Sequence, residues 1–453
     1  MNVNTEEKQD TFESQAKTDL IYGIEDRPPF WDATFAALQH LLAIFVAIIT
    51  PPLIIASAMK LDVETTGFLV SMALFASGIS TFIQCKRVGP VGAGLLCIQG
   101  TSFSFIGPII AAGLSGGLPL IFGACIAAAP LEMVISRTFK YLRKVITPLV
   151  SGIVVLLIGL SLIKVGIISC GGGFSSMDNG TFASAENLGI SGFVFVSVVF
   201  FNRCKNRYLR MSSIVLGLLA GYVLAFALGK VDLAAAANYN FGTFNVPMPF
   251  KYGLDFSWSA FIAIGIVYII TAIEATGDVT ANLMISGEAI EGEKYTKRVE
   301  GGILADGFDS MLAGVFNSFP NSIFAQNNGI IQLTGVASRY VGYYIAGMLV
   351  LLGLFPIVGI VFSLMPDAVL GGATLLMFGT VAAAGIRIIS SQNIDRKATL
   401  VLAISLSLGL GVELMPDILQ HAPEFIKGIF ASGITTGGVV AIIANLVIRV
   451  KED

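Results

Sequence analysis

Apolar segments of about 20 residues recur along nearly the whole chain, and they constrain its fold more than any other feature of the sequence. A helix needs about 20 apolar residues to cross the hydrocarbon core of a bilayer. Of the 453 residues, 55% are hydrophobic and only 13% are charged, whereas soluble domains carry about 25% charged residues. A single soluble core stops growing at about 250–300 residues, so we expect the surplus apolar sequence to face lipid.

The sequence predicts about fourteen membrane-spanning segments between Phe35 and Ile448, two of them short. The clear ones lie near residues 35–59, 66–85, 117–136, 146–167, 188–202, 212–229, 257–275, 339–363, 368–386, 398–413 and 429–448. Glycine and polar residues interrupt the others, near 92–110, 301–316 and 321–335. The expected fold class is an all-α polytopic membrane protein.

The distribution of basic residues supports this number of spans. With fourteen spans and a cytoplasmic N-terminus, the outside segments hold only five of the 27 Lys and Arg residues: Lys60, Lys164, Lys230, Lys251 and Lys427. Cytoplasmic loops of membrane proteins are enriched in Lys and Arg, and one span more or fewer in the middle would move several basic clusters outside. We therefore expect both termini in the cytoplasm and a multi-pass protein of the bacterial inner membrane.

The two halves of the chain share a weak internal similarity. Proline and glycine punctuate two spans in a similar order, at Pro148, Gly152, Gly159 and Gly166 and at Pro366, Gly372, Gly379 and Gly385. A broken polar segment near 99–104 has a counterpart near 323–328. An odd number of spans per repeat inverts the second copy, and inverted repeats with broken elements are typical of secondary transporters. Glycine and proline are also common in membrane helices generally, so the spacing alone leaves both explanations open.

We therefore expect a cytoplasmic tail over 1–30, a first seven-span repeat over 31–230 and a second over 231–453.

Several other classes of protein are disfavoured. The net charge of -3 and the lack of a basic, aromatic-rich run argue against nucleic-acid binding. The five cysteines form no C-x-x-C pair, which indicates free thiols and no metal site. The first thirty residues have no signal-peptide pattern. With only His40 and His421, and without H-E-x-x-H or G-x-S-x-G, no catalytic residues and no cofactor are expected.

Few ionisable residues lie in or beside the apolar segments. Glu274 follows the apolar run 261–273, and Asp278 lies four residues later, on the same face of a helix. Asp306 lies in the apolar stretch 301–315, and His40 opens the first span. Such residues cost about 2.5–3.5 kcal/mol to insert and usually face a cavity or a partner. The alternatives are a helix-end or interfacial charge for Asp278 and Asp306 and a structural histidine for His40.

The segment 317–329 contains too many amides and helix breakers to lie against lipid. Irregular backbone at membrane depth is tolerated only where protein or a water-filled cavity covers it. Amides combine a donor and an acceptor, which matches the edge of a heterocycle. The pattern indicates a polar neutral solute or a weak acid, although a short periplasmic loop is also compatible with it.

Within this segment and beyond it, Gln326-Asn327-Asn328-Gly329-Ile330-Ile331-Gln332-Leu333-Thr334-Gly335 matches a known family pattern. The sequence resembles the nucleobase–ascorbate transporter family, whose motif is Gln, Glu or Pro followed by Asn-x-Gly, four residues and Thr-Gly or Thr-Arg. Asn327, Gly329, Thr334 and Gly335 are the residues that match this motif. The resemblance covers most of the chain, including 25–30, 40–43, 147–164, 274–278 and 304–307, and it is strongest for the bacterial xanthine and uric-acid permeases.

The resemblance implies a fourteen-span fold of two inverted seven-span repeats, arranged as a core domain and a gate domain and usually paired as a homodimer. It implies proton symport, with protons as the only coupling partner. Glu274 would accept N–H groups of the base, and Gln326 would bond its other edge. Phe103 would stack on the ring, and backbone groups near Ser102 and Ala325 would complete the pocket.

Two positions bear on the substrate. Uracil carriers of the family tend to have Glu where Gln326 stands, which favours a purine. Ser102 stands where xanthine carriers usually have Asn and uric-acid carriers have a small hydroxyl residue, so xanthine, uric acid or both remain open. The alternatives are another nucleobase, such as uracil, guanine or hypoxanthine, and an anion exchanger or channel of the same fold. A carboxylate such as Glu274 in the cavity would repel an anionic solute.

Overall fold

The computed structural model describes residues 20–142, 147–206, 209–210, 212–231, 244–390, 394–423, 426, 430 and 432–448. Among these residues, eight helices are long and apolar enough to cross a membrane, or nine if one bent pair counts as a single span. Most of the tail expected over 1–30 lies outside the described residues. So do several of the basic residues whose side of the membrane the sequence predicts: Lys8, Lys17, Arg143, Lys144, Arg207, Lys427, Arg449 and Lys451.

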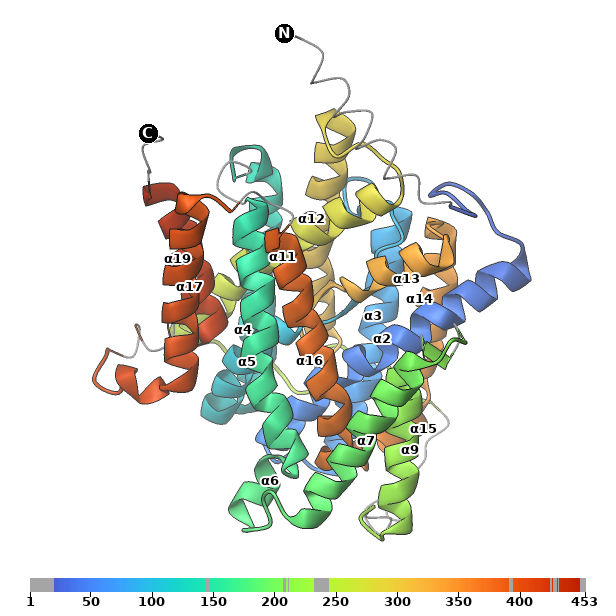
Figure 1. The fold of residues 1–453 in the computed structure, drawn as a ribbon, viewed down its shortest axis with the longest axis vertical. Coiled ribbons are helices and arrows are strands. Elements are labelled where there is room, and N and C mark those ends of the chain that lie inside the picture. Colours follow the sequence, from blue (N-terminus) through green and yellow to red (C-terminus); the bar gives the residue numbers. More distant parts are fainter. Residues whose placement is uncertain are drawn as a thin grey trace.

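The helices follow the expected spans closely in both halves of the chain (Figure 1). The first half forms α2 (Phe30–Ala58), α3 (Val63–Lys86), β1 (Gln99–Thr101), η1 (Phe103–Phe105), α4 (Ile106–Leu142), α5 (Pro148–Cys170), α6 (Gly173–Asp178), α7 (Ala185–Arg203) and α9 (Ser213–Ala227). The second half forms α11 (Trp258–Ile285), α12 (Gly292–Val315), β2 (Asn321–Ile323), α13 (Gln326–Thr334), α14 (Arg339–Leu354), α15 (Pro356–Ser363), α16 (Asp367–Ser390), α17 (Arg396–Leu414), η2 (Pro416–Leu419) and α19 (Gly433–Val447).

Kinks and short helices account for the difference between fourteen expected spans and the smaller number of long apolar helices. Gly117 has φ 69° and ψ -165° and divides α4 into two helical parts, which correspond to two expected spans. The helices α14 and α15 form the bent pair, at an angle of 75°, where Pro356 starts a new helix. The helices α9 and α19 are apolar but shorter than 18 residues.

Helix starts use local side-chain caps in the way the sequence favours. Asp62 accepts a hydrogen bond from the backbone N–H of Thr65 at 2.8 Å and caps α3. Thr147 caps α5, whose first residue is Pro148, and Asp395 caps α17. Such caps satisfy N–H groups that have no partner within the helix, and proline fits the first helical position because it needs no N–H partner there.

The helices pack as two groups, each built from both halves of the sequence. In the first group, α4 packs against α11 and α12, and α14 packs against α2 and α3. In the second group, α16 packs against α5, α7 and α9, while α17 and α19 pack against each other and against α5. Figure 1 shows the second group extending from α19 across α5 and α16 to α9.

The glycine-punctuated spans, α5 and α16, pack directly against each other. A Cβ at Gly159 would overlap the backbone of Ala382, and one at Gly385 would lie 2.6 Å from the Cα of Leu156. These glycines therefore allow the two helix backbones to approach closely. The spacing that suggested a repeat thus lies on two helices that face each other across one interface.

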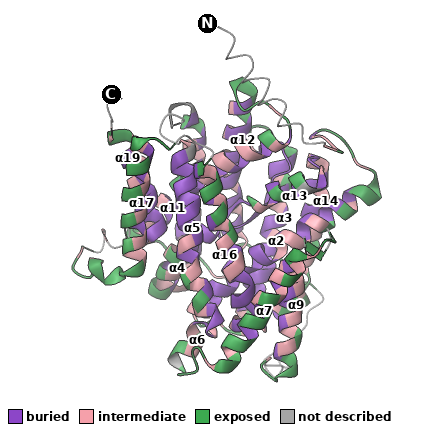
Figure 2. Cartoon of the chain, in the orientation of Figure 1, coloured by how far each residue is buried: buried purple, intermediate pink, exposed green. Residues whose placement is uncertain are grey.

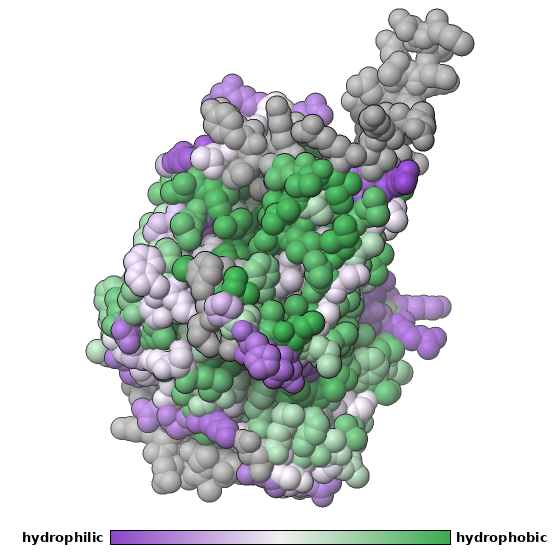
Figure 3. All heavy atoms as spheres, turned by 90° about the vertical axis from the view of Figure 1, so that its left-hand side faces the viewer, coloured by the Kyte–Doolittle hydropathy of each residue, from purple (hydrophilic) through white to green (hydrophobic). Residues whose placement is uncertain are grey.

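Burial separates inner helices from outer ones (Figure 2). In the most apolar window of α3, 78% of the residues are buried, but only 22% are buried in α7 and in α17. The face shown in Figure 3 carries a broad hydrophobic area, with hydrophilic side chains above and below it and a smaller hydrophilic group near the middle. An apolar outer surface of this kind is what a protein surrounded by lipid requires.

The segment before α2 joins the end of α13. The backbone N–H groups of Ile21 and Tyr22 donate to the carbonyl of Gly335, and Ala337 donates to the carbonyl of Tyr22 at 2.9 Å. Arg339 donates to Glu25 Oε2 through Nε at 3.0 Å and Nη2 at 2.7 Å. Two parts of the chain that match the family pattern, around residues 25 and 335, are therefore neighbours in space.

Candidate functional site

The two broken polar segments meet in the middle of the helix bundle. The strands β1 and β2 pair antiparallel, with Gln99 opposite Ile323 and Thr101 opposite Asn321. The backbone N–H of Ser102 donates to the carbonyl of Pro320 at 2.9 Å. The chain continues from β1 into η1 and α4 and from β2 into α13, so each strand leads into a helix. Helix N-termini carry unpaired N–H groups and partial positive charge, which suits them to bind polar groups of a solute.

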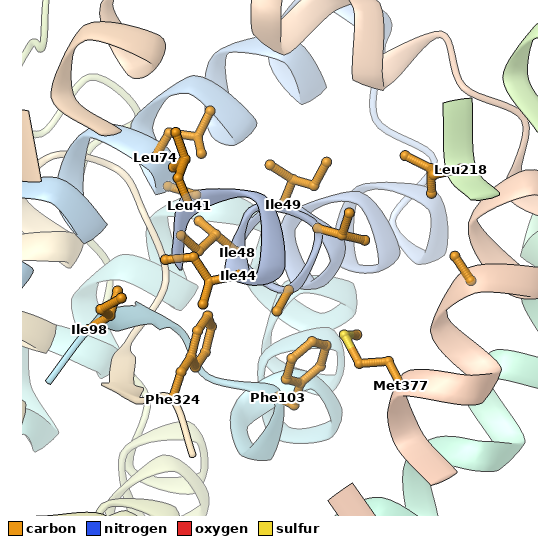
Figure 4. Close-up of a cluster of buried hydrophobic side chains, with 14 of the residues drawn as sticks. Leu41, Ile44, Ile48, Ile49, Leu74, Ile98, Phe103, Leu218, Phe324 and Met377 are labelled. Atoms are coloured by element: carbon orange, nitrogen blue, oxygen red, sulfur yellow. The ribbon is translucent and has the colours of Figure 1, made fainter. Parts of the chain in front are cut away.

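Gly100 makes this crossing possible. A Cβ on Gly100 would overlap the ring of Phe324 and lie 2.9 Å from Ile48 Cγ1. Figure 4 shows Phe103 and Phe324 beneath α2, with Ile44 close to Phe324 and Met377 of α16 close to Phe103. The break is therefore covered by apolar side chains from α2, as irregular backbone at membrane depth requires.

Glu274 lies on α11, which contacts η1, β2 and α13. Its side chain is half-buried, and Ser104 Oγ donates to its Oε2 at 3.4 Å. The structure therefore places Glu274 beside the turn that holds Ser102 and Phe103. Ser104 is a further polar group of the site that sequence reasoning missed, although it lies two residues from Ser102.

Gln326 is the first residue of α13, and Ala325 immediately precedes that helix. Gln326 is half-buried and Ala325 is exposed, so both remain accessible in the contact region of α11 and α13. Ser102 is buried, and its hydroxyl has no hydrogen-bond partner. An unpaired buried hydroxyl costs free energy unless a bound molecule or water completes it.

Phe103 is 8% exposed, and its ring meets Phe378 of α16 edge to face, with 5.4 Å between the ring centroids. This aromatic pair joins the first helix group to the second. Phe103 also lines a cavity of about 470 Å³ between the groups, together with Ile106, Ser161 and Thr435. The residues that line this cavity include neither Glu274 nor Gln326.

Asparagine side chains fix α13 against its neighbours. The amide of Asn327 donates to the carbonyl of Leu96. The amide of Asn328 donates to the carbonyl of Asp278 at 3.2 Å, and its own carbonyl accepts from Asn282 at 3.0 Å. These bonds connect the motif to α11 and to the segment before β1. Asn327 therefore connects α13 to the segment before β1, and Asn282 is a partner of the motif that the sequence did not reveal.

The other motif residues differ in their surroundings. Thr334 Oγ1 donates to the carbonyl of Ile330 at 2.8 Å and accepts from the N–H of Val336 at 3.2 Å. Gly335 ends α13 with φ 69°, a left-handed conformation that glycine adopts without strain. Gly329 has nothing within 4 Å of a Cβ position, so no steric reason for glycine exists in this arrangement.

The remaining predicted acids and the histidine lie around this centre. The Gln99 amide donates to Oδ1 of Asp306, which connects Asp306 to β1. Asp306 and Glu274 are not hydrogen-bonded to each other. Asp278 is buried, with Oδ2 unpaired. His40 does not open the first span as expected, because α2 begins at Phe30. It is fully buried and lies beside Asn327, although neither ring nitrogen makes a well-formed hydrogen bond.

Two further buried acids escaped the sequence reasoning. Glu132 lies on α4, and Asp309 lies one turn after Asp306 on α12. Both are fully buried. A signal for Glu132 existed, because it is an acidic residue inside the apolar stretch 117–136. Within the described residues, no group of three or more His, Cys, Asp and Glu is arranged to hold a metal ion.

The sequence is similar to known proteins along most of its length. Residues 32–418 match the Permease family model named Xan_ur_permease. Two proteins of Escherichia coli (strain K12), named xanthine permeases XanP and XanQ, are each 48% identical to this chain. The alignment with XanP covers 95% of both chains, and the alignment with XanQ covers 96% of this chain and 95% of XanQ.

The fold also resembles the transmembrane domain of a cyanobacterium bicarbonate transporter, BicA, with a TM-score of 0.55 and 13% identity over 94% of this chain and 99% of that one. At this identity the likeness concerns the fold alone, which has two inverted repeats of seven spans. The chain is therefore a membrane transporter, and it belongs to the permease family that its Gln326–Gly335 motif indicates, the nucleobase–ascorbate transporters.

Proposed function

We propose that this permease imports xanthine, uric acid or both across the bacterial cytoplasmic membrane together with protons. The observation that carries the proposal is that α11, the helix of Glu274, contacts both η1 and α13, which Gln326 begins, where the two broken segments pair, and that Ser104 bonds Glu274. Relatives that are 48% identical over 95% or more of the chain and are named xanthine permeases support a purine substrate.

The polar groups at the crossing match the edges of an oxopurine. Glu274 accepts N–H groups of the base, and the Gln326 amide supplies both a donor and an acceptor to the opposite edge. Backbone groups near Ser102 and Ala325 complete the polar contacts. The Phe103 ring provides an aromatic face beside the cavity, where a flat heterocycle would stack.

Proton coupling follows from the cost of a buried charge. Burial disfavours an ionised carboxylate, so Glu274 binds a proton more readily in a closed cavity. A proton and a substrate then stabilise the same occupied state, while a bare charge makes an empty closed state costly. Asp306 of α12, Asp278 of α11 and His40 of α2 are the further candidates for holding or passing this proton.

The larger arrangement belongs to the same proposal. The two helix groups correspond to a core domain, which holds the substrate, and a gate domain, and the repeats extend over 31–230 and 231–453. Both groups draw helices from both halves of the sequence, which supports interleaved repeats. The basic-residue distribution supports cytoplasmic termini, and the family resemblance supports a homodimer surrounded by lipid.

Uptake of labelled xanthine and labelled urate by cells producing the chain, with and without a protonophore, tests this function. We expect saturable uptake of at least one purine above the background of cells without the protein, and its loss on adding the protonophore. Uptake of uracil, guanine or hypoxanthine in preference would identify another nucleobase carrier. Uptake driven by an anion gradient and insensitive to the protonophore would contradict symport and favour an anion exchanger.

A further inference from the structure

Glu132 is a buried acid on α4 whose two oxygens differ in their surroundings. Thr271 Oγ1 donates to Glu132 Oε1 at 3.1 Å, whereas Glu132 Oε2 has no hydrogen-bond partner. Thr271 lies on α11, three residues before Glu274. Residues three apart on a helix are neighbours on its surface, so Glu132 contacts the same part of α11 that carries the predicted substrate acid.

The approach of α4 to α12 brings Glu132 beside Asp306. A Cβ at Gly307 would lie 3.1 Å from both the Ala129 carbonyl and the Met133 backbone nitrogen. Only a residue without a side chain permits so close a contact. Because Gly307 follows Asp306 and Met133 follows Glu132, the two acids come to the same level. Their charges interact, and Glu274 contributes a weaker interaction with Glu132.

The titratable groups that interact with Glu132 are all acids, which are neutral when protonated and negative when ionised. Tyr268 and Glu274 of α11 and Asp306 of α12 interact with Glu132, while Asp278 and Asp309 interact with Asp306 and Cys125 with Tyr268. Among the described residues, no ion pair or hydrogen bond joins any of these acids to a basic side chain. So many carboxyl groups cannot all be ionised in a buried cluster without a cation, and some of them therefore hold protons.

We propose, on the basis of the proton-coupled uptake proposed above, that Glu132 and Asp306 share one proton and that this pair is a proton-holding site behind Glu274. The proton passes between Glu132 Oε2 and Asp306 Oδ2, the oxygens of each acid that lack a partner. When Asp306 receives it, Glu132 becomes a carboxylate that the Thr271 hydroxyl stabilises. When Glu132 receives it, the Gln99 amide stabilises the Asp306 carboxylate. The pair keeps one proton and one negative charge in both arrangements.

The shared proton sets the pH at which active uptake declines. Two interacting acids release their protons in steps that belong to the pair, and a neighbouring negative charge makes the last proton harder to remove. Replacing Glu132 by a neutral residue leaves Asp306 without that neighbour, so its proton leaves at lower pH. Removing the Thr271 hydroxyl has the opposite effect, because an ionised Glu132 then loses its donor.

The test uses the full chain in proteoliposomes and labelled xanthine. Glu132→Gln retains an acceptor for Thr271 and the size of the side chain, but it loses the acid. We expect the midpoint of the decline in active uptake to move to lower pH by about one unit, a tenfold change in proton concentration. For Thr271→Val we expect a midpoint at higher pH. Exchange of internal for external xanthine, which needs no net proton movement, should stay within about twofold of wild type in both variants.

Ser136→Ala is the matched control. Ser136 is buried on the same helix, one turn after Glu132, and its hydroxyl bonds only to the carbonyl of Met133 in its own helix. We expect wild-type pH dependence for this variant, whereas Glu132→Asp, which restores an acid, should recover part of the wild-type midpoint. A shift in Ser136→Ala equal to that in Glu132→Gln would show a merely structural effect of α4.

The outcomes separate this inference from the proposed function. Wild-type uptake that resists a protonophore would remove the proton coupling itself. Protonophore-sensitive wild-type uptake, combined with unchanged midpoints in Glu132→Gln and Thr271→Val, would overturn only the shared proton. If Glu132→Gln is absent from the membrane fraction, Thr271→Val alone tests the inference. A midpoint in Thr271→Val that is unchanged, or that moves to lower pH, then overturns the shared proton.

Discussion

Single hydrogen-bonding groups decide what the crossing of the two broken segments can bind. Gln326 opens α13 at the edge of this region, Ser102 keeps a free hydroxyl, and Glu274 holds one contact, with Ser104. Each of these side chains therefore has hydrogen-bonding capacity left for a solute. The three substitutions below change one such capacity at a time.

Gln326→Glu should weaken purine binding. A carboxylate has no N–H donor, so one carbonyl of the purine stays unpaired in the site. A lost hydrogen bond of this kind costs about 1–3 kcal/mol, or roughly five- to a hundredfold in affinity. Competition of unlabelled xanthine and urate against labelled substrate measures the change. Unchanged competition by both purines would remove Gln326 from the pocket.

Ser102→Asn should shift the choice between purines. Uric acid carries an additional carbonyl on its five-membered ring, and a serine leaves room that an asparagine side chain fills. We expect the ratio of urate to xanthine uptake to fall by about tenfold, as when roughly 1.4 kcal/mol separates two substrates. Ser115→Asn, at the cavity lining away from the crossing, serves as the control. An unaltered ratio in Ser102→Asn would refute the assignment.

Glu274→Gln should abolish accumulation against a gradient. The substitution keeps the size of the side chain and removes the group that titrates, so substrate binding no longer requires a proton. Some binding and exchange should survive, because the glutamine still accepts a hydrogen bond. Uptake is measured with an imposed proton gradient and again without one. Active uptake that persists and still collapses with a protonophore would place the coupling site elsewhere, with Asp306 as the first candidate.

At the scale of elements, close helix packing depends on glycines whose role the sequence only suggests. The helices α5 and α16 meet at Gly159 and Gly385, which lie in the two similarly punctuated spans. Interiors are packed too densely to accept an added methyl group without displacement. The same helix α16 also carries Gly379, where a Cβ would meet nothing within 4 Å.

Gly385→Ala should destabilise the protein, and Gly379→Ala should not. A methyl group at position 385 would be forced against the backbone of Leu156, at a cost of about 1–3 kcal/mol. Thermal unfolding of the purified protein in detergent measures both variants. Both variants lie on α16 and carry the same change from glycine to alanine, so the comparison isolates the contact between position 385 and Leu156. Equal stability of the two variants would show that α5 and α16 are not closely packed here.

The predicted elements agree with the structure where the signal is local. Apolar length marks helices that the structure contains, because it is a property of one segment. By contrast, the sequence alone does not distinguish Gly117, which divides α4, from a glycine inside a continuous helix. The angle of 75° between α14 and α15 likewise depends on how the neighbouring helix packs against them.

At the scale of the whole molecule, two helix groups face each other across the cavity that Phe103 lines. Ser57 of α2 donates a hydrogen bond to Oδ2 of Asp367 on α16 at 2.9 Å, which joins the groups away from this cavity, at a separate pocket that both residues line. A change in the position of one group relative to the other would break or remake such a bond. A ligand or substitution shifts an equilibrium between arrangements only by its differential free energy.

Ser57→Ala should depopulate the arrangement described here. The loss of one hydrogen bond costs about 0.5–1.5 kcal/mol, which lowers the equilibrium constant for this arrangement roughly two- to tenfold, so a cysteine placed at Ser257, on the lining of the cavity, should react more slowly with a soluble thiol reagent. Cys204 is replaced by Ser in this background, since the other native thiols are buried. Ser197→Ala, whose hydroxyl bonds within α7, is the control. An equal labelling rate in Ser57→Ala would contradict a role for this bond in joining the groups.

The sequence by itself determined that the chain crosses a membrane many times and that Gln326–Gly335 is a transporter motif. Both conclusions follow from properties of contiguous residues, namely apolar length and a fixed spacing. Glu274, Asp306 and Asp278 were also found this way, because an acid beside or within an apolar run is conspicuous.

Only the tertiary structure decided which of these groups meet. Gln99 bonds Asp306 across 207 residues of sequence, and Thr271 bonds Glu132 across 139. Such pairs depend on how α4, α11 and α12 approach one another, which is set by the absence of a side chain at Gly307 and by the crossing of β1 and β2 at Gly100. Packing between distant segments leaves no periodic or local trace in a single sequence, and it therefore appears only once the chain is folded.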